Sequence, residues 1–175
     1  ARMDHRHRNG AAGCDTLVTT GAPQSNHARL TAAAGARLGL RVVLVLSEEA
    51  AAPLSGNLTL DALLGAHILW TGGSSPDQVV GEVVEQLRQQ GRTPYVIPFG
   101  GSSALGARGY VEASRELEAQ LPGFETVITA VGSGGTMAGL VAGLGPGRRA
   151  RGGFRCHCAS SLSHLPVRNR RRAPG

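Results

Sequence analysis

Residues 17–40, LVTTGAPQSNHARLTAAAGARLGL, place a β-rich run, a polar turn and an alanine-rich stretch in direct succession. Leu17 to Thr20 predicts a strand, because β-branched residues dominate it. Ser25 to Leu38 predicts a helix that Gly39 closes as a C-cap. Arg41 to Leu46 predicts a second strand, buried on both faces because every residue after the arginine is apolar. This order is typical of a βαβ unit with parallel strands.

The same alternation continues along the middle of the chain. Further helices are predicted over 57–64, 77–90, 103–121 and 136–144, and further strands over 66–70, 95–98 and 126–131, the last of them buried. Strand and helix alternate often enough to predict an α/β fold with parallel sheets and helices on both faces. Ligands of such sheets bind at the C-terminal ends of the strands, so the segments that follow strands are the candidate sites.

Charge is distributed very unevenly along the 175 residues. All 18 basic residues counted as lysine or arginine are arginine, and the sequence contains no lysine. Residues 148–175 hold eight arginines and no acidic residue, whereas residues 11–147 hold seven arginines and eleven acidic residues. The middle therefore offers no basic face, and no nucleic-acid partner is predicted for it. A nucleic-acid protein that works through the arginine-rich tail is the alternative that this charge pattern leaves.

Cysteine use and hydropathy narrow the class further. Three cysteines, at 14, 156 and 158, form no disulfide framework, which indicates a cytoplasmic protein. The longest aliphatic run, Val42 to Leu46, is far shorter than the ~20 residues of a membrane span, and no signal peptide is visible. Cys156-His157-Cys158 with His164 lacks the paired spacing of zinc sites, so no metal site is predicted.

Three loops that follow predicted strands carry the candidate site residues. Val131 to Thr136 (VGSGGT) predicts a phosphate cradle, because glycines and a helix N-terminus turn backbone amides inward. It has neither the Walker lysine nor the GxGxxG spacing. Gly21 to His27 would direct Ser25 and Asn26 at a carboxylate or phenolic oxygen, with simple N-capping as the alternative. Phe99 to Gly106 alone is typical of a capped turn, but three such loops on one edge of a sheet predict a common ligand site.

Several short segments carry a more specific signal. They are Thr20–His27 (TGAPQSNH), Gly56–Leu58 with Leu64–Ala66, Pro94–Ser102 (PYVIPFGGS), Gly109–Glu112 (GYVE) and Gly132–Thr136 (GSGGT). In this order they resemble the D-cysteine desulfhydrase and 1-aminocyclopropane-1-carboxylate deaminase family, whose members carry TxGAxQSNH, PYVIPxGGS and GYVE. The resemblance extends from about Cys14 to Leu144.

The resemblance implies a fold-type-II pyridoxal-phosphate enzyme, similar to tryptophan synthase β, and a homodimeric parent. It implies β-elimination or ring-opening deamination of a small amino acid, which releases ammonia and an oxo acid. By position, Asn26 would bond the phenolic oxygen of pyridoxal phosphate, and Ser25 and His27 would contact the substrate carboxylate. The phosphate would be held by Gly132, Ser133, Gly134, Gly135 and Thr136.

One departure from the family pattern bears directly on activity. The family's Schiff-base lysine lies upstream of the QSNH segment, where residues 1–13 contain no lysine. No catalytic residue is therefore predicted, the cofactor cannot be attached covalently to a lysine, and turnover is expected to be near zero.

The ends of the chain depart from the pattern as well. Residues 1–13 are expected to be disordered or frame-shifted, residues 14–145 to be a partial enzyme core, and residues 146–175 to be a basic, disordered tail. Two alternatives remain: a non-catalytic α/β module that binds a phosphate or nucleotide, and a piece that does not fold because its strand edges lack neighbours.

Overall fold

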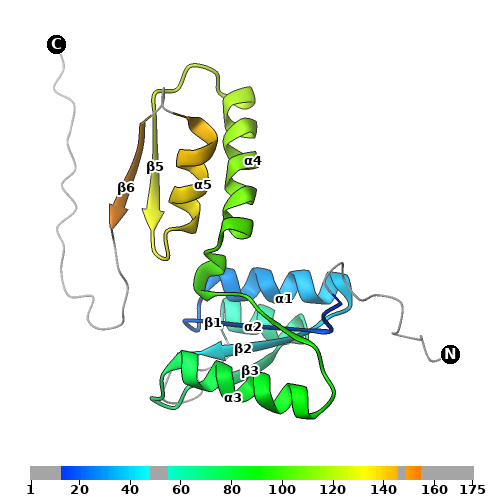
Figure 1. The fold of residues 1–175 in the computed structure, drawn as a ribbon. Coiled ribbons are helices and arrows are strands. Elements are labelled where there is room, and N and C mark those ends of the chain that lie inside the picture. The colour runs from blue at the N-terminus through cyan, green and yellow to red at the C-terminus, as the bar shows by residue number, and fades with distance from the viewer. Residues whose placement is uncertain (1–12, 48–54, 146–148, 155–175) are drawn as a thin grey trace.

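The computed structural model describes residues 13–47 and 55–145 and the backbone of 149–154 (Figure 1). Two parallel sheets form. The larger has the order β3-β2-β1-β4, with β1 at Thr16–Gly21, β2 at Arg41–Leu46, β3 at His67–Trp70 and β4 at Pro94–Val96. The smaller pairs β5, Thr126–Val131, with β6, Arg149–Phe154. The predicted α/β class with parallel sheets is confirmed.

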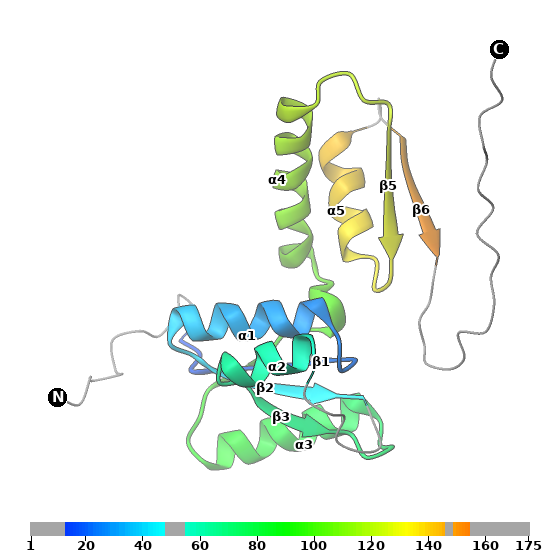
Figure 2. The same cartoon turned by 180° about the vertical axis from the view of Figure 1, so that it is seen from behind.

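Helices cover both faces of the larger sheet, and two more lie beside the smaller one. They are α1 (Asn26–Leu38), α2 (Asn57–Leu63), α3 (Pro76–Gln89), α4 (Ala104–Gln120) and α5 (Gly135–Leu144), with a short 3-10 turn, η2, at Phe99–Gly101. Figures 1 and 2 show α1 and α2 on one face of this sheet and α3 on the other. Each predicted helix and strand lies within a few residues of its expected position.

Strand β2 joins two hydrophobic cores, which explains why every residue after Arg41 in it is apolar. Successive side chains of a strand point to opposite faces. One set packs against α1 and α2: Val42, Leu44 and Leu46 with Ala28, Ala32 and Leu58. The other set packs against α3: Val43 and Val45 with Val83, Val84 and Leu87. Burial of each valine or leucine contributes about 1.5–3 kcal/mol to the hydrophobic driving force.

Helix α1 is held in place at both ends and at one glycine. The Ser25 side chain accepts the amide hydrogen of Ala28 at 3.1 Å, and Gly39 closes the helix in the left-handed region with φ of 70°. Gly35 faces β2 so closely that a Cβ atom there would run into the side chain of Val42. The helix therefore lies close against the sheet, with its N-terminus at the C-terminal end of β1.

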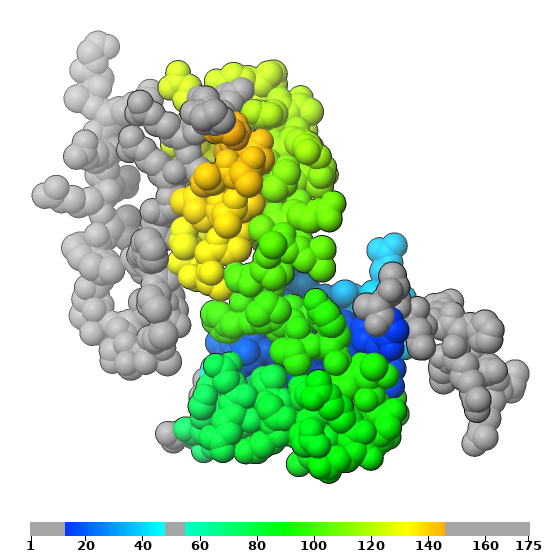
Figure 3. Space-filling model, in the orientation of Figure 1, coloured from blue at the N-terminus to red at the C-terminus, as the bar shows by residue number. Residues whose placement is uncertain are grey.

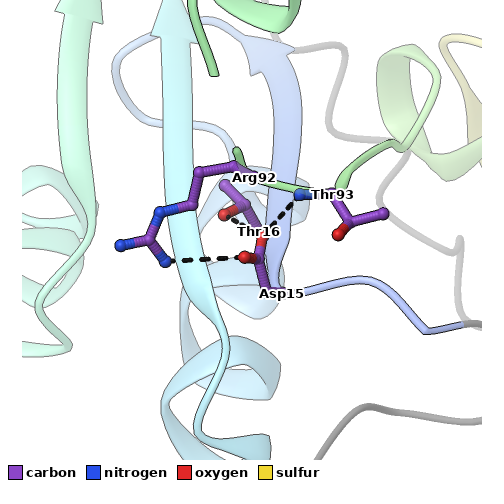
Figure 4. A network of polar contacts seen from close by, with 4 residues as sticks. All are labelled: Asp15, Thr16, Arg92 and Thr93. Atoms are coloured by element: carbon purple, nitrogen blue, oxygen red, sulfur yellow. Dashed lines mark hydrogen bonds and ion pairs between the residues drawn. The ribbon is translucent and has the colours of Figure 1, made fainter. Parts of the chain in front are cut away.

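The opposite end of β1 is fixed by Asp15 (Figure 4). Its carboxylate accepts hydrogen bonds from the Thr16 hydroxyl at 2.8 Å and the Thr93 amide at 3.1 Å, and it lies 3.6 Å from the Arg92 guanidinium. Thr93 immediately precedes β4, so one carboxylate ties the start of the central strand to the start of its neighbour.

Helices α4 and α5 pack side by side (Figure 3), next to the smaller sheet (Figure 1). Glycines make this contact possible. A Cβ atom at Gly139 would meet Ala107 and Tyr110 of α4, and one at Gly143 would meet Val111 and Ser114. The high glycine content of the chain is thus used partly for helix packing and not only for turns.

Two expectations about the second sheet are wrong. Strand β5 was expected to be buried, but its residues alternate between exposed and half-buried, and Ile128 is 80% exposed. Among the described residues, α4 and α5 lie along one face of the smaller sheet (Figure 1). Alternate side chains of β5 therefore point away from these helices. Residues 149–154 were expected to have no regular structure, yet they pair with β5 over six residues. Backbone hydrogen bonds along a free strand edge form with little regard to side-chain composition.

Candidate functional site

The loop after β1 turns directly into α1. The Ser25 amide donates to the Ala22 carbonyl at 2.9 Å, and the Ser25 side chain caps the helix. Gly21 permits this turn, because a Cβ atom there would lie 2.9 Å from both Cβ and Oγ of Ser25. The amides of Asn26 and His27 in the first turn have no hydrogen-bond partner among the described residues. They are available to an anion at this helix end. Both the capping reading and the ligand reading of Ser25 are therefore compatible with the geometry.

Gln24 and Asn57 lock the loop to the start of α2. The Asn57 amide donates to Gln24 Oε1 at 2.9 Å, and Asn57 Nδ2 donates to the Gln24 carbonyl at 2.8 Å. Asn57 Nδ2 also reaches Asn26 Oδ1 at 3.3 Å, and Arg29 approaches the same oxygen at 3.4 Å. The side-chain oxygen of Asn26, Oδ1, therefore already accepts hydrogen bonds, which leaves the Nδ2 group as the donor for an oxygen atom of a ligand. Sequence reasoning did not find the role of Gln24.

His27 is linked to the interior of the sheet. Its Nε2 atom lies 2.9 Å from the Thr19 hydroxyl, which in turn donates to the Ile97 carbonyl at 2.9 Å. Burial lowers the pKa of the His27 imidazole below its usual value. His27 thus takes part in a polar chain that runs from α1 through Thr19 of β1 to Ile97, just after β4.

The loops after β4 and β5 contact each other. The Ser102 hydroxyl lies 2.5 Å from the Ser133 hydroxyl and accepts the Gly135 amide at 3.1 Å. Two glycines make the approach possible: a Cβ atom at Gly100 would overlap the Ser133 side chain, and one at Gly135 would lie 2.8 Å from Ser102 Oγ. Ser102, which lies in the predicted loop Phe99 to Gly106, therefore joins the loops after β4 and β5.

The three predicted loops do come together, but not on one sheet. Those after β1 and β4 belong to the larger sheet, and Gly132–Gly135 follows β5 of the smaller one. They meet because the loop after β4 contacts both of the others. A Cβ atom at Gly101 would lie 3.3 Å from Cε1 and 3.4 Å from Nδ1 of His27, and the neighbouring Gly100 adjoins Ser133. The expectation of a single sheet edge is corrected to a junction between two sheets.

The donor set at this junction suits a phosphate. Gly134 adopts a φ of 90° at the start of α5, and a Cβ atom at Gly132 or Gly134 would meet nothing within 4 Å, so the loop borders open space. The amides of Thr136 and Met137 have no hydrogen-bond partner among the described residues. With the hydroxyls of Ser133 and Thr136 they form a neutral, donor-rich cradle at a helix N-terminus, and the Ser102 hydroxyl, which donates to Ser133, supports it from the loop after β4. A lysine amine for a covalent link is absent from the sequence.

A cavity of about 510 Å³ lies elsewhere in the fold. Its lining includes Arg41, His67 and Gln90, at the N-terminal ends of β2 and β3 and the C-terminal end of α3. Ligands of parallel sheets bind at the opposite, C-terminal ends of the strands. The junction, with its free donors, is therefore the stronger candidate site.

Asp61 is a buried charge that the sequence did not reveal. Its side chain in α2 is fully buried, and neither carboxylate oxygen has a hydrogen-bond partner among the described residues. Burial raises the pKa of the Asp61 carboxyl, and the charge of Arg29 acts in the opposite direction. This carboxyl lies one turn after Asn57 in α2.

Comparison with known proteins identifies the family. The family model described as "Pyridoxal-phosphate dependent enzyme" matches residues 2–171, a range that runs through most of both terminal segments. The chain belongs to this family of pyridoxal-phosphate dependent enzymes. It is 46% identical over 141 residues to a D-cysteine desulfhydrase of Yersinia pestis, which covers 75% of this chain and 43% of that protein. It is 44% identical over 138 residues to a Pyrococcus abyssi protein named for 1-aminocyclopropane-1-carboxylate deaminase, covering 75% of this chain and 41% of that one.

Solved structures of pyridoxal-phosphate enzymes share the fold. An ACC deaminase homologue matches with a TM-score of 0.70 and 40% identity over 76% of this chain and 42% of that chain. A threonine deaminase matches with a TM-score of 0.63 and 23% identity over 79% of this chain and 44% of that chain, which shows the fold alone. The fold-type-II prediction is confirmed. The chain spans less than half the length of these relatives.

Membrane and metal sites can be addressed for the part of the chain that the structure describes. No helix there is long and apolar enough to cross a membrane. No group of three or more histidine, cysteine or acidic side chains is placed to hold a metal ion within the same residues. Cys156, His157, Cys158 and His164 lie outside the described residues.

Proposed function

We propose that this chain is the phosphate-binding portion of a pyridoxal-phosphate enzyme that eliminates or deaminates a small amino acid, as D-cysteine desulfhydrases do. We propose also that, with no lysine in its sequence, it holds the cofactor non-covalently and turns over substrate at a rate near zero. When bound, pyridoxal phosphate supplies the electron sink for bond breaking at the amino acid's α-carbon.

The observation that carries the proposal is the meeting of the three loops. In this arrangement Gly132 to Thr136 would bind the phosphate through amides and hydroxyls. Asn26 would donate from Nδ2 to the phenolic oxygen, because its carbonyl is already held by Asn57 and Arg29. The free amides of Asn26 and His27, beside the Ser25 hydroxyl, would receive the substrate carboxylate. Two relatives at 44–46% identity, a D-cysteine desulfhydrase and a protein named for 1-aminocyclopropane-1-carboxylate deaminase, support this proposal.

The test measures binding with ligands that differ in one group each. Pyridoxal phosphate and pyridoxamine phosphate should bind with similar affinity, because no covalent link contributes, whereas pyridoxal without the phosphate should bind at least about tenfold more weakly. Replacement of Gly135 by alanine, which would push against Ser102, should weaken both phosphate ligands. Gly109→Ala is the matched control, because a Cβ atom there meets nothing within 4 Å.

Turnover is measured on the same protein. With pyridoxal phosphate present, D-cysteine should give no sulfide, and 1-aminocyclopropane-1-carboxylate no ammonia, above the rate of free cofactor. Borohydride reduction followed by peptide mapping should place any covalent adduct at the N-terminal amine alone. Tighter binding of ATP than of pyridoxamine phosphate would favour a nucleotide-binding module, and lysine-independent turnover would overturn the inactive assignment.

A further inference from the structure

The chain of polar contacts at β1 fixes the hydrogens as well as the heavy atoms. Thr19 is fully buried in the strand, and its hydroxyl lies 2.9 Å from two partners, the Ile97 carbonyl oxygen and His27 Nε2. A threonine hydroxyl carries one hydrogen, and a carbonyl oxygen can only accept. If the hydroxyl hydrogen goes to Ile97, the contact with His27 is a hydrogen bond only when Nε2 carries the second hydrogen.

The opposite arrangement loses a hydrogen bond. Were Nε2 unprotonated, the hydroxyl would have to donate to it, and the Ile97 carbonyl would lose the Thr19 hydroxyl as its donor. A carbonyl deprived of its donor in a partly buried place is costly. The first arrangement satisfies both contacts. For the neutral imidazole, protonation of Nε2 leaves Nδ1 as a lone-pair acceptor.

The acceptor nitrogen lies beside the loop after β4. The Nδ1–Cε1 edge of His27 is the edge closest to Gly101, and Nδ1 has no hydrogen-bond partner among the described residues. Any side chain at position 101 would lie against this edge, at 3.3–3.4 Å from Cβ. Gly101 has a φ of 67°, so the backbone conformation also favours glycine there. The imidazole is thus held from the sheet side by Thr19, and its Nδ1 edge faces a loop residue that has no side chain.

We infer that Thr19 is a positioning residue that holds neutral His27 as its Nε2–H tautomer, so that His27 presents an acceptor, Nδ1, to the loop junction. An acceptor suits an N–H or O–H group of a ligand, such as the amino group of an amino acid, and does not suit a carboxylate. The carboxylate then falls to the amides of α1 and to Ser25, and His27 takes the donor end of the substrate. The assignment of a substrate group to Nδ1 rests on the proposed function, whereas the tautomer does not.

The tautomer can be measured on the ligand-free protein. Long-range ¹H–¹⁵N correlation spectra distinguish the two ring nitrogens, because Nε2 couples to both ring protons and Nδ1 strongly to one. The His27 signals are assigned by their loss in His27→Asn. At pH 8, the protonated nitrogen should be Nε2, in at least about tenfold excess over the other tautomer.

Two substitutions separate positioning from mere packing. Thr19→Val keeps the shape but removes the hydroxyl, so the tautomer excess should fall at least severalfold, whereas Thr19→Ser keeps the hydroxyl and should restore it. A wild-type His27 with Nδ1 protonated would overturn the inference, and so would an unchanged tautomer ratio in folded Thr19→Val. If Thr19→Val does not fold, the wild-type spectrum decides the question. Failure of pyridoxamine phosphate to bind would contradict the proposed function but would not affect the assignment of the His27 tautomer.

Discussion

A pair of glycine substitutions tests how closely α1 lies against the larger sheet. Gly35 in α1 and Gly81 in α3 both occupy helix interiors. Replacing either glycine by alanine should add about 0.5–1 kcal/mol to the free energy of unfolding through helix propensity alone. The difference between them is the surroundings: a Cβ atom at Gly35 would run into Val42, and one at Gly81 would meet nothing within 4 Å.

The magnitudes follow from these contacts. Forcing a methyl group into a packed contact costs about 1–3 kcal/mol. Gly81→Ala should therefore gain about 0.5–1 kcal/mol of unfolding free energy, and Gly35→Ala should lie about 1–3 kcal/mol below it. Because the propensity gains cancel in the comparison, the difference between the two variants reports the α1–β2 contact directly.

Urea unfolding followed by circular dichroism at pH 7 provides the measurement. The denaturation midpoint should move in opposite directions for the two variants, with an unchanged slope m that shows the same surface is exposed on unfolding. Equal stabilisation by both substitutions would refute the reasoning. It would mean that α1 stands away from β2, and the loop geometry built on the N-terminus of α1 would lose its support.

Three further predictions concern buried or bonded polar groups. Because burial lowers the pKa of His27, the unfolded chain takes up a proton there at a higher pH than the folded chain. The stability that the neutral imidazole contributes should be present above pH ~6.5 and be lost as the pH falls through the folded pKa. The urea midpoints of wild type and His27→Asn should therefore converge as the pH falls from 8 to 5. Midpoints that stay a constant distance apart over this range would contradict the lowered pKa. Because burial raises the pKa of Asp61, the folded chain favours its protonated form, and stability is lost as the pH rises through the folded pKa. The unfolding free energy of Asp61→Asn should therefore rise relative to that of wild type between pH 4 and 7. A difference in unfolding free energy that does not change with pH would show that the carboxylate has a partner. Asp15→Ala should cost about 1–3 kcal/mol, chiefly because it leaves the buried Thr16 hydroxyl without its acceptor and also removes the acceptor of the exposed Thr93 amide. Arg92→Ala is the milder control, because it removes only the ion pair at 3.6 Å, and equal, small losses would mean that Asp15 does not tie β1 to β4.

The sequence predicted the local elements well because their signals are local. The apolar run of β2, the serine before α1 and the glycine after it each determine a boundary through nearby contacts. The glycine loops were found for the same reason, since backbone conformations at positions such as Gly134 need glycine and leave amides free.

The features that the sequence did not predict depend on distant pairings. The hydrogen bond from Thr19 to Ile97 joins residues 78 positions apart, and Ser102 meets Ser133 across 31 positions. No periodicity encodes such contacts. Strand β5 looked buried because a short apolar run cannot reveal whether its second face is covered. Asp61 gave no signal because one acidic residue in a short helix is ordinarily exposed.

We propose that the loops after β1, β4 and β5 together form one site for pyridoxal phosphate and its amino-acid substrate. This proposal is tested most directly by the amide chemical shifts of the protein during titration with pyridoxamine phosphate, which binds without an aldehyde. The largest changes in chemical shift should be those of the amides of Asn26 and His27, of Gly100–Ser102 and of Gly132–Met137 together. The chemical shifts of amides that line the cavity near Arg41 and His67 should not change. Shifts confined to that cavity, or to only one of the three loops, would contradict the account.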